Sequence, residues 1–339
     1  MDMNWRKIIR KYNKVDIAKS NWQLVTTLGL YVTAWFIAYK AYQVSPWLCL
    51  GVAALAQVFF GRLFIILHDL GHGTFYRSKA VRTFWGNVLG IIWFTPYEQW
   101  TKGHATHHRH SGNLDHRGTG DIWVLTIEEY EDSSLLKKLA YRICRFPPFV
   151  IFVGGMYVYF GAQRLTNKGD GAKEKRSVWI ANIGIVIMAV MISFVTSLKF
   201  YLFYQFFLMY FGATLAVFFF YVQHQYEDVY WEHSDQWDYE TAALEGCSNL
   251  VIPKVIQWAS GNIGFHHIHH LSHNIPNYNL EKAYKENPMF QKATNLTLWE
   301  CLKCFNLALY SMREKKMITF KEYYDGLGHA ENYALDISR

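Results

Sequence analysis

Histidines stand in short runs of this sequence, at spacings that suit metal binding. The densest run lies in 261–278 (GNIGFHHIHHLSHNIPNY) and holds five histidines within eight residues. A neutral imidazole is a common metal ligand and otherwise a poor helix residue, so the run favours a metal site. Read as a helix, His266, His269 and His270 stand at i, i+3 and i+4. The spacing predicts three rings on one face near a common centre, with His267 pointing elsewhere.

A second run, HDLGH, places His68 and His72 at i and i+4 on one helical face. A zinc metalloprotease of the HExxH type would carry glutamate at position 69, and Asp69 is one methylene short of that general base. We therefore expect Asp69 to orient a ligand histidine by accepting a hydrogen bond from its ring.

A third run, HATHH, repeats the i, i+3, i+4 spacing with His104, His107 and His108. His110 and His116 follow closely, and we expect them at the polar surface or behind the ligands. A single HxxxH pair occurs often by chance. Three runs become informative only if the fold brings them to one place, which depends on the elements that carry them.

Composition indicates which elements these are. Of 339 residues, 51% are hydrophobic and 18% aromatic, with only 7 prolines, which is typical of long apolar helices. The net charge of +7 comes from basic residues beside the apolar segments, a placement that fits anionic lipid headgroups, and no nucleic-acid-binding motif is present. The five cysteines are scattered, which argues against a disulfide framework and for a reducing compartment.

Four apolar runs approach the roughly 20 residues that a membrane-spanning helix needs. The first lacks the small-residue cleavage site of a signal peptide, so we expect it to be retained. Basic residues crowd the first twenty positions and are sparse in the outer links, which predicts that both termini are cytoplasmic. The predicted spans are about 24–42, 47–67, 178–198 and 200–222.

The remainder, 68–176 and 223–339, is expected to form a cytosolic helical cap, so the sequence predicts one all-α integral membrane domain over 1–339. Two apolar patches in the cap, 84–94 and 146–160, contain glycines or follow prolines, and we interpret them as interfacial or re-entrant. Lys199 alone separates the last two spans, which predicts a helical hairpin. Arg62, near the inner end of the second span, is expected to reach water or lie beyond the hydrocarbon.

This topology brings the inner ends of the second and fourth spans together, and His224 at the end of the fourth joins the histidine set. Nine imidazoles exceed the four ligands that satisfy a structural zinc ion, so two ions are implied. Spacing alone leaves Zn, Cu, Fe and Ni open. A site where apolar helices leave the membrane is placed to act on a lipid chain. Oxygen activated by iron can break the C–H bonds of such a chain, and hydrolysis cannot. The candidate ligands are His68, His72, His104, His107, His108, His224, His266, His269 and His270.

With these motifs together, the sequence resembles the membrane fatty acid desaturases with three histidine boxes. HDLGH, HATHH and HHIHH correspond to the boxes, and the segments around FYVQHQYEDVYW and LSHNIPNYNL are similar to bacterial acyl-lipid desaturases of the Bacillus type. The likeness runs from about residue 62 to residue 280. One departure is His273, which stands where relatives often have proline.

The resemblance implies two irons held by the nine histidines and reduced by outside electrons. It implies that dioxygen is used to remove hydrogens from adjacent methylenes of a membrane lipid acyl chain, leaving a cis double bond. The chain shows no nicotinamide, flavin, haem or iron–sulfur motif, so we expect a separate carrier of the ferredoxin or flavodoxin type. Further residues are candidates to support ligands or to contact substrate, namely Asn262, Asp121 and Trp123. The turn 118–123 is a candidate to shape the substrate entrance.

Other functions share some of these features. Related hydroxylases and carotenoid-modifying oxygenases carry the same boxes, and their products retain oxygen. A metal transporter would place polar or charged residues within its spans, yet 178–198 and 200–222 hold no carboxylate and no histidine. A zinc hydrolase would need a general base beside the ions, and no run offers glutamate there. We expect a desaturase of the bacterial plasma membrane with a cytoplasmic active site.

Overall fold

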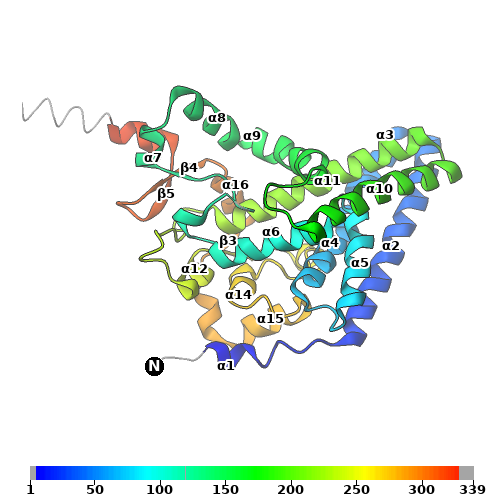
Figure 1. Cartoon of the computed structure of the whole chain (residues 1–339), viewed down its shortest axis with the longest axis horizontal. Coiled ribbons are helices and arrows are strands. Elements are labelled where there is room, and N and C mark those ends of the chain that lie inside the picture. Colours follow the sequence, from blue (N-terminus) through cyan, green and yellow to red (C-terminus); the bar gives the residue numbers. More distant parts are fainter. Residues whose placement is uncertain (1–4, 119, 328–339) are drawn as a thin grey trace, which may run out of the picture.

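Three long apolar helices dominate the structure, a computed structural model that describes residues 5–118 and 120–327. They are α2 (Ile17–Val44), α10 (Ala172–Val195) and α11 (Leu198–His224), and each is long and apolar enough to cross a bilayer. Their ends meet at the upper right of Figure 1, and the smaller elements occupy its left side and lower middle. The long helices agree with the predicted first, third and fourth spans.

The second predicted span is a bent pair of helices. It consists of α3 (Pro46–Leu55) and α4 (Gln57–His72), which meet at an angle of 43°. The hydroxyl of Ser45 accepts a hydrogen bond from the backbone N–H of Trp47, and Pro46 occupies the first turn, so the sequence starts α3 sharply. Together α3 and α4 are long and apolar enough to form one broken span.

A second bent pair covers the patch 146–160. Here α8 (Leu135–Arg145) meets the helical stretch 147–164 at 63°. That stretch runs through α9 (Pro147–Phe149), two π-helical turns, η2 (Val150–Gly154) and η3 (Tyr157–Gly161), and the turn η4 (Ala162–Arg164). Gly155 lies against the backbone of Ala213 in α11, where a Cβ atom would overlap it. The described residues thus contain three to five candidate spans, depending on how the bent pairs are counted.

The patch 84–94 lies mostly in helix α5 (Lys79–Ile92), which is followed by α6 (Tyr97–His110). Gly86 and Gly90 on α5 allow the chain to fold back tightly, because a Cβ atom at either position would overlap Tyr97 or the carbonyl of Thr95. This turn directs α6 and its histidines toward the end of α4.

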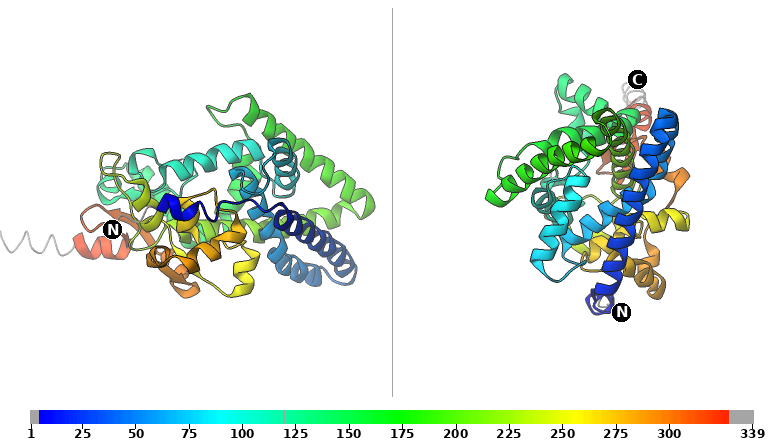
Figure 2. Two further views of the ribbon diagram at one scale, coloured as in Figure 1. Left: turned by 90° about the horizontal axis from the view of Figure 1, so that it is seen from below. Right: turned by 90° about the vertical axis from the view of Figure 1, so that its right-hand side faces the viewer.

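The hairpin between α10 and α11 turns at Thr196 and Ser197 and not at Lys199. The Ser197 hydroxyl accepts a hydrogen bond from the backbone N–H of Phe200, and α11 starts at Leu198, two residues before the predicted start of the span at 200. Lys199 therefore lies in the first turn of α11. Figure 2 shows the two helices diverging from this turn.

Arg62 does not reach water as we expected from the sequence. Its side chain is 7% exposed, donates to the carbonyl of Trp258 and lies 4.3 Å from the ring of that tryptophan. The cause is the packing of α13 (Lys254–Ala259) across α4, which covers the arginine and provides a cation–π partner.

Short elements complete the fold, and they include strands that the all-α expectation lacked. One sheet has the order β1-β4-β5, with β1 (Leu125–Thr126) parallel to β4 (Leu307–Ser311) and β5 (Lys316–Thr319) antiparallel to β4. In the other, β2 (Asn249–Val251) is parallel to β3 (Asn295–Thr297). Strands this short leave almost no alternating pattern in a sequence. The remaining helices are α1 (Trp5–Ile9), η1 (Leu114–His116), α7 (Ile127–Glu131), α12 (Tyr239–Glu245), α14 (His266–Leu271), α15 (Asn277–Glu286), η5 (Pro288–Lys292) and α16 (Leu298–Cys304).

The histidine runs meet where α4, α6, α11 and α14 come together, near the middle of Figure 1. α4 ends at His72 because Gly73 takes a left-handed conformation (φ 78°), and α11 ends at His224. An apolar cluster from α1, α14 and α15 packs on the far side of α14. The short α14 is therefore held between the long helices and the N-terminal segment.

Candidate metal centre

All nine candidate histidines lie in one buried region, and they fall into two groups. Within each group the potential ligand nitrogens lie within 4.8 Å of one another. The first group comes from α4, α6 and α14, and the second from α6, α11 and α14. The first group is His68, His72, His104, His108 and His269; the second is His107, His224, His266 and His270.

Each of the two i, i+3, i+4 runs is divided between the groups. On α14, His266 and His270 belong to the second group and His269 to the first, so the three rings do not share a common centre as predicted. On α6, His104 and His108 belong to the first group and His107 to the second. Adjacent residues are about 100° apart around a helix, so His269 and His270 must face different centres.

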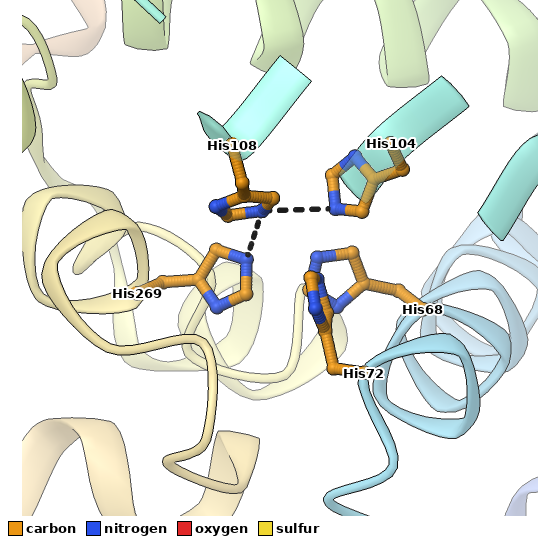
Figure 3. Close-up of side chains that lie close together, drawn as sticks. All are labelled: His68, His72, His104, His108 and His269. Atoms are coloured by element: carbon orange, nitrogen blue, oxygen red, sulfur yellow. Dashed lines mark hydrogen bonds between the residues drawn. The ribbon is translucent and has the colours of Figure 1, made fainter. Parts of the chain in front are cut away.

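The nitrogen separations fit ligands gathered around an ion. In the first group the Nε2 atom of His108 lies 3.1 Å from that of His104 and 3.0 Å from that of His269, as Figure 3 shows. In the second, the Nε2 atom of His224 lies 3.1 Å from that of His107 and 2.9 Å from that of His266. Two nitrogens bound to one ion at about 2.1 Å and at right angles would be about 3 Å apart.

Several rings have their other nitrogen engaged, which leaves Nε2 free for a metal. Nδ1 of His68 lies 3.1 Å from the Asp69 carboxylate, and Nδ1 of His107 lies 2.7 Å from the Asp121 carboxylate. Nδ1 of His224 lies 3.3 Å from the carbonyl oxygen of Gly246. Each oxygen accepts a hydrogen bond from Nδ1–H, which fixes the tautomer and the ring orientation that metal binding needs.

Two further nitrogens need a partner that the protein does not supply. Nε2 of His72 and Nε2 of His270 are both buried, and neither has a hydrogen-bond partner among the described residues. Leaving a buried polar atom unpaired costs roughly 1–3 kcal/mol, so an unpaired Nε2 atom in each group fits rings that bind a metal ion. The donor set, all imidazole nitrogen, suits Zn, Cu, Fe or Ni.

Burial keeps these imidazoles in the form that binds metal. Desolvation, with a further contribution from neighbouring imidazoles, holds the pKa values of five of the six α6 and α14 ligands well below the ordinary 6.5. A depressed pKa means that the neutral ring is favoured at neutral pH. The residues concerned are His104, His108, His266, His269 and His270.

Asp69 is held by a residue that the sequence did not single out. The backbone N–H and the side-chain Nδ2 of Asn277 both donate to the Asp69 Oδ2 atom, each at 2.9 Å. Asn277 is 2% exposed, and its Oδ1 atom accepts from Gln23 Nε2 of α2 at 3.1 Å. The chain of contacts runs from α2 through Asn277 and Asp69 to His68. No local sequence signal marks Asn277, because its burial and its contact with Asp69 are visible only in the structure.

The other predicted supporting residues lie farther from the rings. The side chain of Asn262 bonds to Gln257 and to the backbone carbonyl of Asn277, and Asn262 has a φ of 61°. It therefore supports the loop before α14. Trp123 is 39% exposed and packs edge-on against Tyr141, with ring centroids 5.1 Å apart. In the turn 118–123, residue 119 lies outside the described part of the chain.

The remaining histidines near the site belong to neither group. The Nε2 atom of His267 lies 2.8 Å from the carbonyl oxygen of Phe290, and burial lowers the pKa of His267 to about 4. His273 stacks on His72 with ring centroids 5.1 Å apart. The rings of His110 and His116 lie 4.5 Å from each other.

Comparison with known proteins identifies what this chain is similar to. The sequence profile described as fatty acid desaturase matches residues 45–301. A protein named fatty acid desaturase from Bacillus subtilis is 36% identical over 315 residues, which cover 93% of this chain and 90% of that protein. An sn-1 oleoyl-lipid 12-desaturase of Picosynechococcus is 27% identical, covering 73% of this chain and 71% of the relative. An sn-1 acyl-lipid omega-3 desaturase (ferredoxin) of Nostoc is 24% identical, covering 72% and 68%.

Proposed function

Because this chain belongs to the fatty acid desaturase family, we propose that it introduces a cis double bond into the acyl chains of membrane lipids, using dioxygen and external electrons. It is a membrane protein and a desaturase by family. The lipid-bound substrate is inferred from relatives whose names specify acyl lipids. The observation that carries the proposal is the division of nine histidines, seven of them buried, into two adjacent groups that could each hold a metal ion, beside apolar helices.

We infer that each group holds one iron ion, five histidines around the first and four around the second. Iron bound there would supply the oxygen activation that breaking unactivated C–H bonds requires. The protein's own part is to fix the ligands. Asp69 and Asp121 hold His68 and His107 in one tautomer, and the Gly246 carbonyl does the same for His224.

Aromatic side chains beside the histidines would align the acyl chain and keep water out. The ring of Trp100 stacks on His104 with centroids 4.6 Å apart, and Phe64 packs against Trp100 at 5.6 Å. Phe220 lies 5.1 Å from the ring of His107. These apolar surfaces flank both groups, so a methylene pair can be placed next to the metals without a polar contact, and position along the chain then selects the bond.

We further propose four spans with the histidine groups on the cytoplasmic side of a plasma membrane. The spans would be α2, the α3–α4 pair, α10 and α11, with the cap formed by the remaining elements. The basic N-terminal segment supports this orientation through the positive-inside tendency. The chain ends, 1–4 and 328–339, lie outside the described residues.

The electron donor is proposed to be a small acidic carrier of the ferredoxin or flavodoxin type, in keeping with a relative named for ferredoxin. The basic residues of the cap offer a docking surface, but not all of them are free. Arg145 is 3% exposed and bonds to Gln225, and Lys173 forms an ion pair with Glu98. Lys137 and Lys175 are exposed and remain for such a contact.

Expression in a bacterial host that lacks desaturases would test the function. We expect new cis-monounsaturated acyl chains in membrane lipids, formed only with oxygen, and their double bond can be located by mass spectrometry of disulfide adducts. The variant His269→Ala should give none. Hydroxylated or keto products would assign the chain to an oxygen-inserting reaction, and the absence of any unsaturated product with an active electron donor would refute the proposal.

A further inference from the structure

A buried arginine lies beside the inner end of α11. It is Arg145, the last residue of α8, and it is 3% exposed. Its hydrogen bonds within the described part of the chain all go to neutral oxygens, so no carboxylate balances its charge there. Burying an ionised group is costly unless the acceptors around it are well placed. The positions of these acceptors therefore indicate what the arginine does.

The guanidinium group joins three segments that are far apart in the sequence. Its Nη1 atom donates to the Oε1 atom of Gln225 at 3.0 Å, and its Nη2 atom donates to the carbonyl oxygen of Leu307 in β4 at 2.7 Å. The carbonyl oxygen of Trp123 lies farther from Nη1, at 3.5 Å. A guanidinium carries its N–H donors in a rigid planar fork, so one side chain can hold several acceptors in a fixed arrangement.

The contact with Gln225 leads directly to a candidate metal ligand. Gln225 follows His224 and leaves the helical conformation (φ −133°, ψ 83°), so α11 ends at the ligand. The last carbonyl groups of a helix lack partners within that helix. The Nε2 atom of Gln225 donates to the carbonyl oxygen of His224 at 2.8 Å, and Gln225 is 1% exposed. The buried amide therefore connects the guanidinium with the backbone of His224.

The contact with Trp123 leads to a second ligand, although less directly. Trp123 stands two residues after Asp121, whose carboxylate lies 2.7 Å from the Nδ1 atom of His107. Among the described residues, no hydrogen bond leads from Arg145 or its partners to a histidine of the first group. Both His107 and His224 belong to the second group. The contacts of the arginine therefore end at one of the two groups.

We propose that Arg145 is a positioning residue for the second histidine group and controls how tightly that group binds its ion. It holds His224 through the amide of Gln225 and, more weakly, His107 through the segment 121–123. This inference rests on the proposed function for the presence of two ions, whereas the contacts themselves need no ion. A change at Arg145 should act on the second ion and leave the first one unaffected.

Competition with a chelator in the full-length protein tests this proposal, with the two ions distinguished by their Mössbauer spectra. Arg145→Gln removes the fork, and we expect the second ion to be bound about tenfold more weakly, as is typical when a support of a metal ligand is lost. The affinity for the first ion should stay at the wild-type value. The variant His224→Ala, which lacks a ligand of the second group, identifies the spectrum of each ion.

The matched control is Arg164→Gln. The guanidinium of Arg164 also donates to a side-chain amide oxygen, that of Asn182 at 2.8 Å, and to a backbone carbonyl oxygen, that of Phe94. In the described part of the chain no hydrogen bond leads from these partners to a histidine. Both ions should keep their wild-type affinity in this control. Equal weakening of both ions in Arg145→Gln, or two unchanged affinities, would overturn the proposal.

A second variant tests the connection if Arg145→Gln does not fold. Gln225→Met removes the amide between Arg145 and His224 and keeps the contact of the guanidinium with Leu307, so it should weaken the same ion. Adding Arg145→Gln to Gln225→Met should weaken that ion little further, because the two residues act mainly through one connection. Fully additive effects, or a Gln225→Met variant with wild-type affinity for both ions, would contradict the proposed connection.

Hydrogen–deuterium exchange of the metal-free protein gives a readout that does not depend on any ion. In Arg145→Gln the backbone of 219–226, at the end of α11, should exchange faster than in the wild type, and that of 66–73, at the end of α4, should not. Unchanged exchange in 219–226 would overturn the proposal. A wild type that binds a single ion would instead refute the two-ion part of the proposed function, and the exchange result would still decide the role of Arg145.

Discussion

Replacing Asn277 by alanine should weaken metal binding in the first histidine group, although Asn277 touches no ligand. Its side-chain Nδ2 and backbone N–H each donate to Asp69 Oδ2 at 2.9 Å, and Asp69 in turn orients His68. Asn277→Ala deletes the side-chain bond to Asp69, together with the contacts of the amide with Gln23, and keeps the backbone bond to Asp69. A hydrogen bond to a charged group contributes about 1.5–3 kcal/mol, and loss of an outer support around a metal ligand typically costs 10–100-fold in affinity.

The matched control is Asn279→Ala on the same helix. The Asn279 Nδ2 atom donates to the carbonyl oxygen of Tyr12 at 2.8 Å, so this variant also loses a long-range side-chain hydrogen bond, partly buried in this case, but no contact leads from it to a histidine. Both variants should lower the melting temperature, Asn277→Ala by more because it loses more bonds. Only Asn277→Ala should release iron to a competing chelator at a lower chelator concentration. Equal iron affinity in the two variants would refute the link from Asn277 through Asp69 to His68.

The same contacts and charges lead to further expectations. His267→Ala should retain most of its metal, because His267 Nε2 bonds to the carbonyl oxygen of Phe290 and lies outside both groups. His269→Ala should abolish activity. Equal loss of iron in the two variants would contradict the assignment of the α14 histidines to the two groups. The melting temperature of metal-free protein should fall as pH drops below about 6.5. Below that pH the histidines of the unfolded chain bind protons, whereas in the folded protein histidines with lowered pKa values, such as His104 and His266, stay neutral. An unchanged melting temperature between about pH 7 and 5 would contradict this. Turnover with a soluble acidic carrier should fall as salt is raised, because exposed charges are screened beyond about 8 Å at 0.15 M ionic strength, and a flat salt profile would exclude electrostatic docking.

The parts of the fold that sequence could predict are those with long, uniform signals. Continuous apolar runs placed α2, α10 and α11 within a few residues of their observed positions, and the density of histidine indicated a metal site. Local chemistry at the ends escaped prediction. Ser197 starts α11 earlier than the apolar pattern suggested, because a serine hydroxyl can satisfy an exposed N–H of the first turn.

Contacts between elements far apart in the sequence determine the ligand grouping, the burial of Arg62 and the support of Asp69, which the sequence alone does not predict. Spacing places His266, His269 and His270 on adjacent parts of a helix, but the rotation of α14 against α6 and α11 decides which ring joins which group. Arg62 was expected to reach water or to lie beyond the hydrocarbon. Its burial under Trp258 depends on a contact between residues nearly 200 positions apart. Asn277 supports Asp69 across 208 positions of sequence, and no local pattern reports such a pairing.

Counting iron in the purified protein is the most direct test of the two-centre site. We expect two iron ions per chain in the wild type. The variant His224→Ala removes a ligand that belongs only to the second group, so it should retain one ion, held by the intact first group. Mössbauer spectra of the two proteins would show whether the remaining iron keeps one of the two wild-type environments. A single ion in the wild type, zinc in place of iron, or loss of both ions in His224→Ala would contradict two separately held irons.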